Sequence, residues 1–153
     1  RFNLGVLFWT PVIFILMGLT ADAVTSLSGG YNYFTTEIFQ YIKPLSIFDK
    51  FAALAPMAIL YGLLNGFYEE FCFLGLLTCV EDKYKWHALA YSTLVRVSFH
   101  TYQGMLWATV IGVVFGLMYY FFYKYKVKNL LPFFLIHALA DIFGSGFIYL
   151  ICA

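Results

Sequence analysis

The sequence predicts an all-α membrane protein: a polytopic bundle of about five transmembrane helices with one short interfacial helix. Of its 153 residues, 63% are hydrophobic and only 11% are charged, whereas a typical soluble domain has about 25% charged residues. Apolar runs recur along the whole chain. The length suits one domain, so we expect a single transmembrane domain over residues 1–153. Because the sequence starts with Arg1, we expect an N-terminal portion to be missing.

A helix needs about 20 residues to cross the roughly 30 Å hydrocarbon layer of a bilayer. The longest expected span carries a possible N-cap at Asp49 and a bend near Pro56. Between the first two spans, residues 26–50 place apolar side chains at helical spacing among Thr, Glu and Gln, which favours a helix lying in the interface. The five expected spans are residues 4–24, 50–80, 86–103, 105–123 and 130–151.

The few charges exclude some partners and orient the chain. A formal net charge of +1 leaves no basic patch that could neutralise many phosphates, so we expect no nucleic acid partner. Lysines gather in the loops at residues 81–85 and 124–128. Cytoplasmic loops are enriched in Lys and Arg. We therefore expect an integral, multi-pass protein of the bacterial plasma membrane, with these loops in the cytoplasm and the lipid bilayer as its surroundings.

Three of the apolar segments carry ionisable side chains in their interior. Such groups are costly in a membrane and usually belong to a functional site in a water-accessible cavity. Two of the three sets have a spacing of four residues, which puts both members on one face of a helix. The six side chains are Glu69 and Glu70, Arg96 and His100, and His137 and Asp141.

These residue types suit hydrolysis. Water is a poor nucleophile until a base takes its proton, and Glu69 or Glu70 can be that base. His100 or His137 can hold the water or donate to the developing oxyanion, and Asp141 can orient an imidazole. The same set suits zinc-bound water, since His and carboxylates bind zinc. The residues leave open whether a metal takes part, with zinc as the candidate.

The motifs also resemble a known family. Glu69-Glu70 precede FCFLG, His100 follows in RVSFHTYQG, and His137 and Asp141 stand in PFFLIHALAD. In order and spacing, this pattern is similar to the EExxxR, FxxxH and HxxxN or HxxxD motifs of the CPBP (CAAX protease, bacteriocin-processing, Abi-type) intramembrane proteases. The resemblance covers roughly residues 64–144.

The resemblance implies a reaction and assigns roles to residues. Glu69 matches the glutamate that activates water and Glu70 its neighbour, while His100 matches the second motif and His137 with Asp141 the third. The implied activity is endoproteolysis of a membrane-associated protein or peptide, of CAAX type or bacteriocin-leader type. The family is commonly described as metalloproteases, and the resemblance itself leaves the choice between metal-bound and glutamate-activated water open.

Two positions depart from the family pattern. Leu74 stands where the arginine of EExxxR is expected, which removes the partner four residues after Glu70. Arg96 stands where the phenylalanine of FxxxH is expected. We therefore expect Arg96 to supply the missing positive charge from the next helix and to pair with Glu70.

Two other classes of function compete with a protease. Because of Leu74, the chain could be a catalytically inactive scaffold or immunity protein that keeps the fold. Alternatively, buried Glu, His and Asp could relay protons in a transporter. Transporters often contain inverted repeats, and this sequence shows no internal repeat. The protease remains the favoured interpretation.

Overall fold

The computed structural model describes residues 2–28, 55–144 and 146. Every regular element in these residues is helical, which confirms the all-α class. The helices form five stretches. They are α1 (Leu4–Ser28); α4 (Pro56–Glu70), continued by a π-helix (Phe71–Leu76); α5 (Lys85–Phe99); α6 (Met105–Thr109) and α7 (Gly116–Phe122), joined by a π-helix (Val110–Phe115) and extended by another (Tyr123–Val127); and α8 (Leu131–Phe143).

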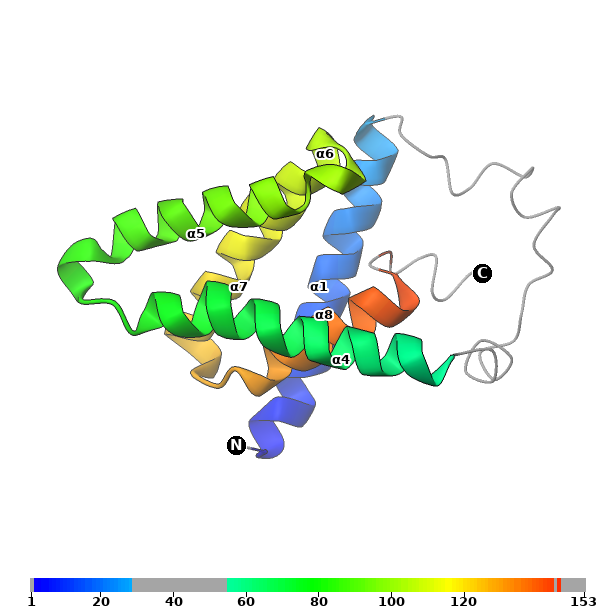
Figure 1. Ribbon diagram of the computed structural model, residues 1–153. Helices are drawn as coiled ribbons and strands as arrows, with labels where there is room; N and C mark the ends of the chain where they lie inside the picture. Colours follow the sequence, from blue (N-terminus) through cyan, green and yellow to red (C-terminus); the bar gives the residue numbers. More distant parts are fainter. Residues whose placement is uncertain (1, 29–54, 145, 147–153) are drawn as a thin grey trace, which may run out of the picture.

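The helices pack in two groups around a common core. In the first group, α8 contacts both α4 and α1. In the second, α5 packs along the helix that contains α6 and α7, as Figure 1 shows. Aromatic and aliphatic side chains fill the space between the groups; for example, the rings of Tyr119 and Phe133 lie 5.2 Å apart. This arrangement brings one face of α4, α5, α7 and α8 toward a shared interior.

Glycines allow the closest helix contacts. A Cβ atom on Gly66 of α4 would lie 2.9 Å from the main-chain nitrogen of Ala138 in α8. A Cβ atom on Gly112 would lie 2.8 Å from the main-chain nitrogen of Val97 in α5. Small residues at helix interfaces let backbones approach in this way. The two contacts therefore fix α4 against α8 and α5 against the 105–127 helix.

Two of the helical stretches are long and apolar enough to cross a membrane, Leu4–Ser28 and Met105–Val127. The apolar α8 is shorter, and it ends where Gly144 has a φ of 87°, so the expected continuous span 130–151 is wrong at this residue. For the expected spans 50–80 and 86–103, crossing of the membrane remains a prediction.

The expected span 50–80 also starts differently. The helix begins at Pro56, and Ala55 before it is extended, with φ −67° and ψ 132°. A residue before proline avoids the helical region, and proline suits the first turn of a helix, so Pro56 starts this helix rather than bending it. The expected cap at Asp49 and the interfacial helix at 26–50 fall largely or wholly outside the described residues.

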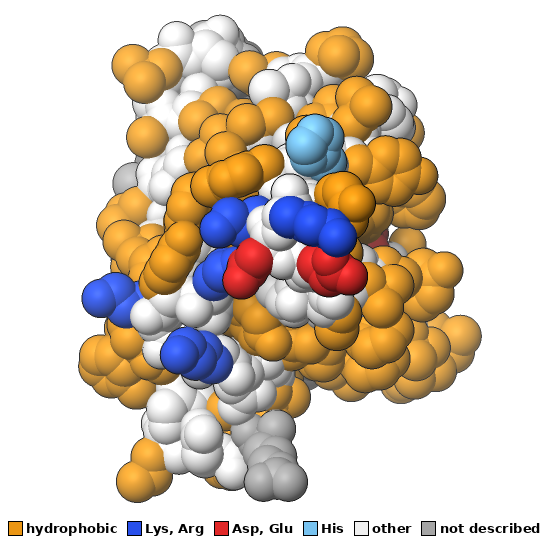
Figure 2. Space-filling view, turned by 90° about the vertical axis from the view of Figure 1, so that its left-hand side faces the viewer, with side chains coloured by type: hydrophobic (Ala, Val, Ile, Leu, Met, Phe, Trp, Pro, Cys, Tyr) orange, Lys and Arg blue, Asp and Glu red, His pale blue; other side chains and the backbone are white. Residues whose placement is uncertain are grey.

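The outer surface is mainly apolar. Figure 2 shows hydrophobic side chains over most of one face, around a cluster of charged groups. That cluster includes the α4–α5 connection, where Lys83 lies 2.8 Å from Glu81, and it reaches the other lysine-rich segment, where Lys124 lies 3.4 Å from Asp82. The two lysine-rich loops are thus neighbours at one end of the bundle.

Candidate active site

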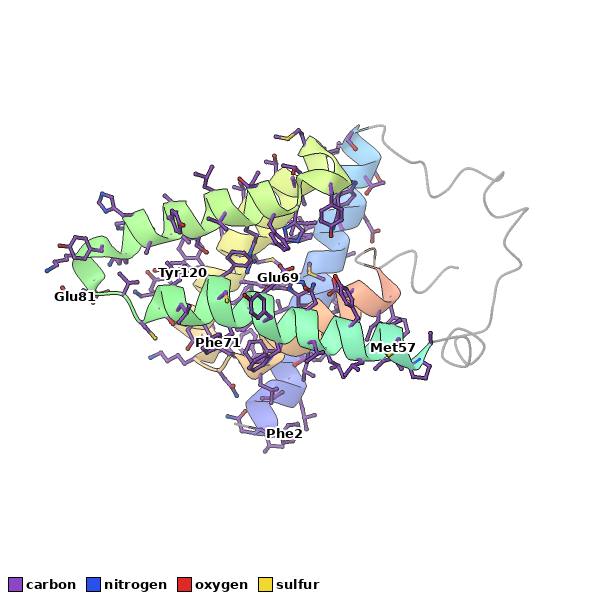
Figure 3. All side chains as sticks on the ribbon, viewed as in Figure 1. Phe2, Met57, Glu69, Phe71, Glu81 and Tyr120 are labelled. Atoms are coloured by element: carbon purple, nitrogen blue, oxygen red, sulfur yellow. The ribbon has the colours of Figure 1, made fainter. Side chains whose placement is uncertain are left out.

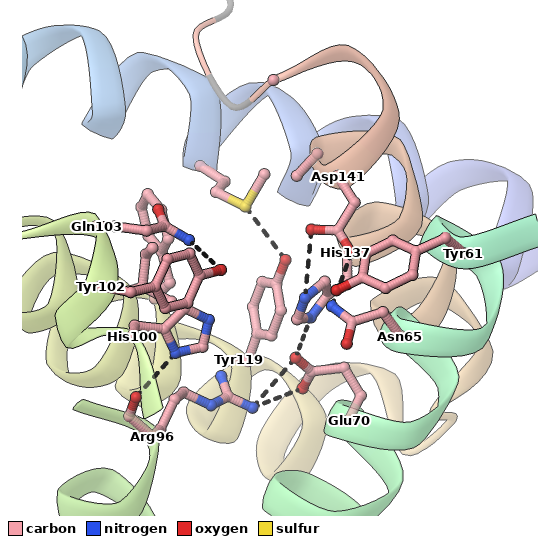
Figure 4. Close-up of a pocket in the computed structure, with 15 residues that line it drawn as sticks. Tyr61, Asn65, Glu70, Arg96, His100, Tyr102, Gln103, Tyr119, His137 and Asp141 are labelled. Atoms are coloured by element: carbon pink, nitrogen blue, oxygen red, sulfur yellow. Dashed lines mark hydrogen bonds and ion pairs between the residues drawn. The ribbon is translucent and has the colours of Figure 1, made fainter. Parts of the chain in front are cut away.

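A cavity of about 400 Å³ opens between the two helix groups. Its walls combine ionisable and polar side chains from four helices, as Figure 4 shows. Its polar and ionisable members include Asn65, Glu70, Arg96, His100, Tyr119, His137 and Asp141. Polar side chains that the sequence spreads over 76 positions, from Asn65 to Asp141, thus share one space in the protein interior.

The Arg96 guanidinium holds Glu70. Its Nη2 atom lies 3.1 Å from Glu70 Oε1 and 3.0 Å from Oε2, and the Glu70 side chain is fully buried. Arg96 is also buried and lies over the ring of Phe73, 4.9 Å from its centroid. The expected Arg96–Glu70 pair is therefore confirmed. A buried carboxylate needs such a partner because burial without one is very costly.

Leu74 occupies the place from which the family arginine would reach Glu70. Its side chain is 2% exposed and belongs to the hydrophobic core. Leu74 and Arg96 also line one small internal space between the helices. The Arg96 guanidinium thus lies near Leu74, the position of the motif arginine, and supplies the positive charge that pairs with Glu70.

His137 is anchored to the same carboxylate. Its Nδ1 atom lies 2.8 Å from Glu70 Oε1. An ionised carboxylate only accepts hydrogen bonds, so Nδ1 is the protonated nitrogen and Nε2 points away from Glu70. One turn later in α8, Asp141 Oδ1 lies 3.7 Å from His137 Nε2. The other oxygen of Asp141 accepts a hydrogen bond of 2.9 Å from Asn65 Nδ2 of α4.

His100 is anchored to the main chain. Its Nδ1 atom lies 2.8 Å from the carbonyl oxygen of Arg96 at the end of α5. A carbonyl oxygen can only accept, so Nδ1 is protonated and donates this hydrogen bond. The ring is buried, with 4% of the residue exposed.

Glu69 faces both imidazoles. Its Oε2 atom lies 3.7 Å from His100 Nε2 and 3.8 Å from His137 Nε2. These separations are too long for hydrogen bonds, and this buried oxygen has no hydrogen-bond partner among the described residues. The two histidine rings line the cavity, whereas Glu69 is not among its lining residues. Figure 3 places it in the interior, between the helices.

Glu69, His100 and His137 offer the oxygen and nitrogen atoms that zinc prefers. However, no group of three or more His, Cys, Asp or Glu among the described residues is arranged to hold an ion. The side chains as they stand do not fit a metal centre, so no chemical step is assigned to one.

The structure brings the six predicted side chains into one cluster and adds two that the sequence did not single out. Asn65 binds Asp141. Tyr119 stands in an aromatic run of a kind typical of membrane interfaces, but it is 3% exposed and lines the cavity because this face of α7 turns inward. No local motif marks either residue.

An all-helical bundle with apolar exterior helices and an interior cluster of Glu, His and Arg defines a class of membrane-embedded, hydrolase-like proteins. Within this class the family is identified by comparison. Residues 51–143, which are more than half of the chain, match the family described as type II CAAX prenyl endopeptidase Rce1-like, and the chain belongs to this family. Membership implies a CAAX-type membrane protease that acts on a protein substrate. No curated protein and no solved structure matches the chain significantly.

Proposed function

We propose that the protein is an active intramembrane endopeptidase that hydrolyses a peptide bond of a membrane-associated protein or peptide, of CAAX type or bacteriocin-leader type. The observation that carries the proposal is the buried Glu69 Oε2 atom, which has no hydrogen-bond partner among the described residues and has two imidazole nitrogens within 3.8 Å. Polar atoms separated by more than about 3.5 Å do not bind each other directly, and a water molecule can connect them. A water molecule bound between these three atoms would lie beside a base.

The environments of the two glutamates favour Glu69 as the base. Both oxygens of Glu70 accept from Arg96, and Oε1 also accepts from His137. A carboxylate stabilised in this way is a weak proton acceptor. Glu69 Oε2 has no such partner. We therefore assign proton abstraction to Glu69 and a positioning role to Glu70, which fixes the ring of His137.

The reaction then needs only water and the peptide. The water gives one proton to Glu69 and is held beside it by Nε2 of His100 or His137. Its oxygen attacks the carbonyl carbon, and the electron pair of the C=O bond moves to the carbonyl oxygen. When the C–N bond breaks, the proton on Glu69 passes to the departing nitrogen. The products are a carboxylic acid and an amine, so atoms and charges balance.

The position of the lysines supports an orientation of the bundle in the membrane. The α4–α5 connection and the end of the 105–127 helix meet at Lys124 and Asp82, so both lysine-rich loops lie on one side. Lysine-rich loops favour the cytoplasm. We therefore propose that α4, α5 and α8 lie in the bacterial plasma membrane with the two candidate spans, and that substrates reach the cavity from the bilayer.

The test is cleavage of peptides by the purified protein in detergent, using a prenylated CAAX peptide and a bacteriocin leader peptide. We expect cleavage by the wild type and a loss of about 10²–10⁴-fold in Glu69→Gln and His137→Ala, which is the range for general base catalysis. The matched control is Glu81→Gln, an exposed glutamate in the α4–α5 connection, which should cleave like the wild type.

Other outcomes separate the alternatives. Cleavage that survives both site substitutions would contradict the site assignment. A wild type that cleaves neither peptide contradicts the activity proposal and favours the inactive scaffold or immunity protein, and proton-coupled uptake by proteoliposomes would instead favour the transporter. Cleavage abolished by a chelator and restored by zinc would contradict the metal-free route.

A further inference from the structure

The cavity must also stabilise the negative charge that forms on the carbonyl oxygen during hydrolysis. This requirement rests on the proposed function. The site already holds three carboxylates, Glu69, Glu70 and Asp141, against one guanidinium, that of Arg96. Hydrogen-bond donors aimed at the developing oxyanion are usually among the largest contributions to such a reaction. The question is which donor of this cavity is free to serve.

Most donors near the base are already directed elsewhere. The Nδ1–H group of His100 points to the Arg96 carbonyl oxygen, and that of His137 points to Glu70. Both Nδ1–H groups are thus already engaged and are not free to donate to an oxyanion. Arg96 Nη2 binds both oxygens of Glu70, and Asn65 Nδ2 binds Asp141.

Tyr119 is different. Its side chain stands in the cavity wall between His100 and His137, with the hydroxyl directed into the cavity, as Figure 4 shows. The hydroxyl donates to the sulfur of Met17 in α1 at 3.2 Å. A thioether is a weak acceptor. Replacing this hydrogen bond by one to an anionic oxygen therefore gives the hydroxyl a stronger hydrogen bond. Hydrogen bonds to charged groups are roughly twice as strong as neutral ones.

The ring of Tyr119 is held so that only its hydroxyl is free to reorient. The residue is 3% exposed, and the ring packs edge-on against Phe133 at a centroid distance of 5.2 Å. A rigid ring with a rotatable O–H bond is a pre-organised donor. Tyr119 lines the same cavity as Glu70, Arg96 and Asp141, so its hydroxyl belongs to the candidate site.

We propose that Tyr119 is a catalytic residue that donates a hydrogen bond to the carbonyl oxygen as it becomes the oxyanion. Substrate binding turns the hydroxyl from Met17 toward this oxygen. No proton is transferred from the phenol: it donates throughout, and the hydrogen bond returns to the sulfur when the C–N bond breaks and the carbonyl re-forms. Met17 thus serves as a resting acceptor that keeps the hydroxyl oriented between turnovers.

The experiment compares Tyr119→Phe with Tyr120→Phe in cleavage of the prenylated CAAX peptide. Each variant removes one hydroxyl from adjacent buried tyrosines of α7, but Tyr120 does not line the cavity. For Tyr119→Phe we expect kcat to fall by about 10²–10³-fold, the cost of losing one oxyanion donor, with KM and the unfolding midpoint unchanged. Tyr120→Phe should retain wild-type kcat.

The unfolding midpoint separates catalysis from packing. A purely structural role for the Tyr119–Met17 hydrogen bond predicts that Tyr119→Phe lowers the unfolding midpoint together with kcat. The catalytic role predicts that kcat falls while the midpoint stays at the wild-type value. Equal kcat in Tyr119→Phe and Tyr120→Phe, beside an inactive Glu69→Gln, would overturn the role of Tyr119 and leave the protease intact. A wild type that cleaves nothing would overturn both.

Discussion

Two pairs of adjacent carboxylates stand twelve residues apart in the sequence and lie in opposite surroundings. Glu69 and Glu70 end α4 in the protein interior, with 4% and 0% of each residue exposed. Glu81 and Asp82 form the α4–α5 connection, where their side chains are 71% and 86% exposed. Figure 3 shows Glu69 between the helices and Glu81 at the outer tip. The same chemical groups therefore face very different energetic demands.

The carboxylates of the two regions differ in the partners that stabilise their charge. In the interior, Glu70 is held by Arg96 and His137 at distances of 2.8–3.1 Å. In the connection, each carboxylate is paired with a single lysine, and both pairs are exposed to solvent. Ion pairs in water contribute little, while breaking a buried pair leaves a charge without compensation. We therefore expect the removal of a charged partner to lower the free energy of unfolding strongly in the interior and hardly at all in the connection.

The largest effect on stability is expected for Arg96→Leu. The substitution leaves Glu70 buried with His137 as its only remaining partner among those described. Removing one partner of a buried pair costs about 3–5 kcal/mol. Reversible unfolding in mixed detergent micelles measures the change in the free energy of unfolding. A loss similar to that of an exposed lysine would contradict the distinction between the two regions.

The double variant Leu74→Arg with Arg96→Phe is the control for that prediction. It returns the cation to the position where the family pattern has it, beside the same small internal space. We expect it to recover cleavage and most of the lost stability, because Glu70 regains a partner from its own helix. An inactive, destabilised double variant would show that position 96, and not the charge, is what matters.

A smaller effect is expected for Gly66→Ala, which tests how α4 is held against α8. The added methyl group would lie 2.9 Å from the Phe134 carbonyl oxygen and from the Ala138 nitrogen. Main-chain atoms cannot move aside cheaply, so the helices must separate, at a cost of about 1–3 kcal/mol. Because Asn65 and Asp141 bond across this contact, cleavage should fall as well. Unchanged stability would indicate that the contact is looser than described.

The smallest effect is expected for Lys124→Ala at the exposed end of the bundle. Its partner Asp82 is open to solvent and the pair is 3.4 Å long. We expect no measurable change in the unfolding midpoint and no change in cleavage, since isolated surface pairs often contribute nothing measurable. Asp82→Asn should behave in the same way. A loss comparable to that of Arg96→Leu would remove the contrast between exterior and interior charges.

The sequence predicts the parts of this account that depend on residue type and local spacing. Apolar runs indicate the helices, and His137 with Asp141 at a spacing of four indicates one face of α8. The pairing of Arg96 with Glu70 is also predictable, because one helix lacks a charge and the next helix has one in excess.

Other parts depend on how helices rotate and pack, which a single sequence does not encode locally. Tyr119 belongs to a run of aromatic residues, and only the packing of α7 turns it inward. Asn65 bonds to Asp141 because Gly66 lets α8 approach, so its partner lies far along the chain. The end of α8 before Gly144 lies within an otherwise apolar run, where hydropathy gives no signal.

Our central proposal is that the neighbours Glu69 and Glu70 have different roles: Glu69 acts as the base, and Glu70 anchors His137. The most direct test measures kcat and the free energy of unfolding for Glu69→Gln and Glu70→Gln in one preparation. We predict that Glu69→Gln loses at least about 10²-fold in kcat with unfolding unchanged, whereas Glu70→Gln loses about 3–5 kcal/mol of stability. A stable, inactive Glu70→Gln beside an active Glu69→Gln would contradict the assignment.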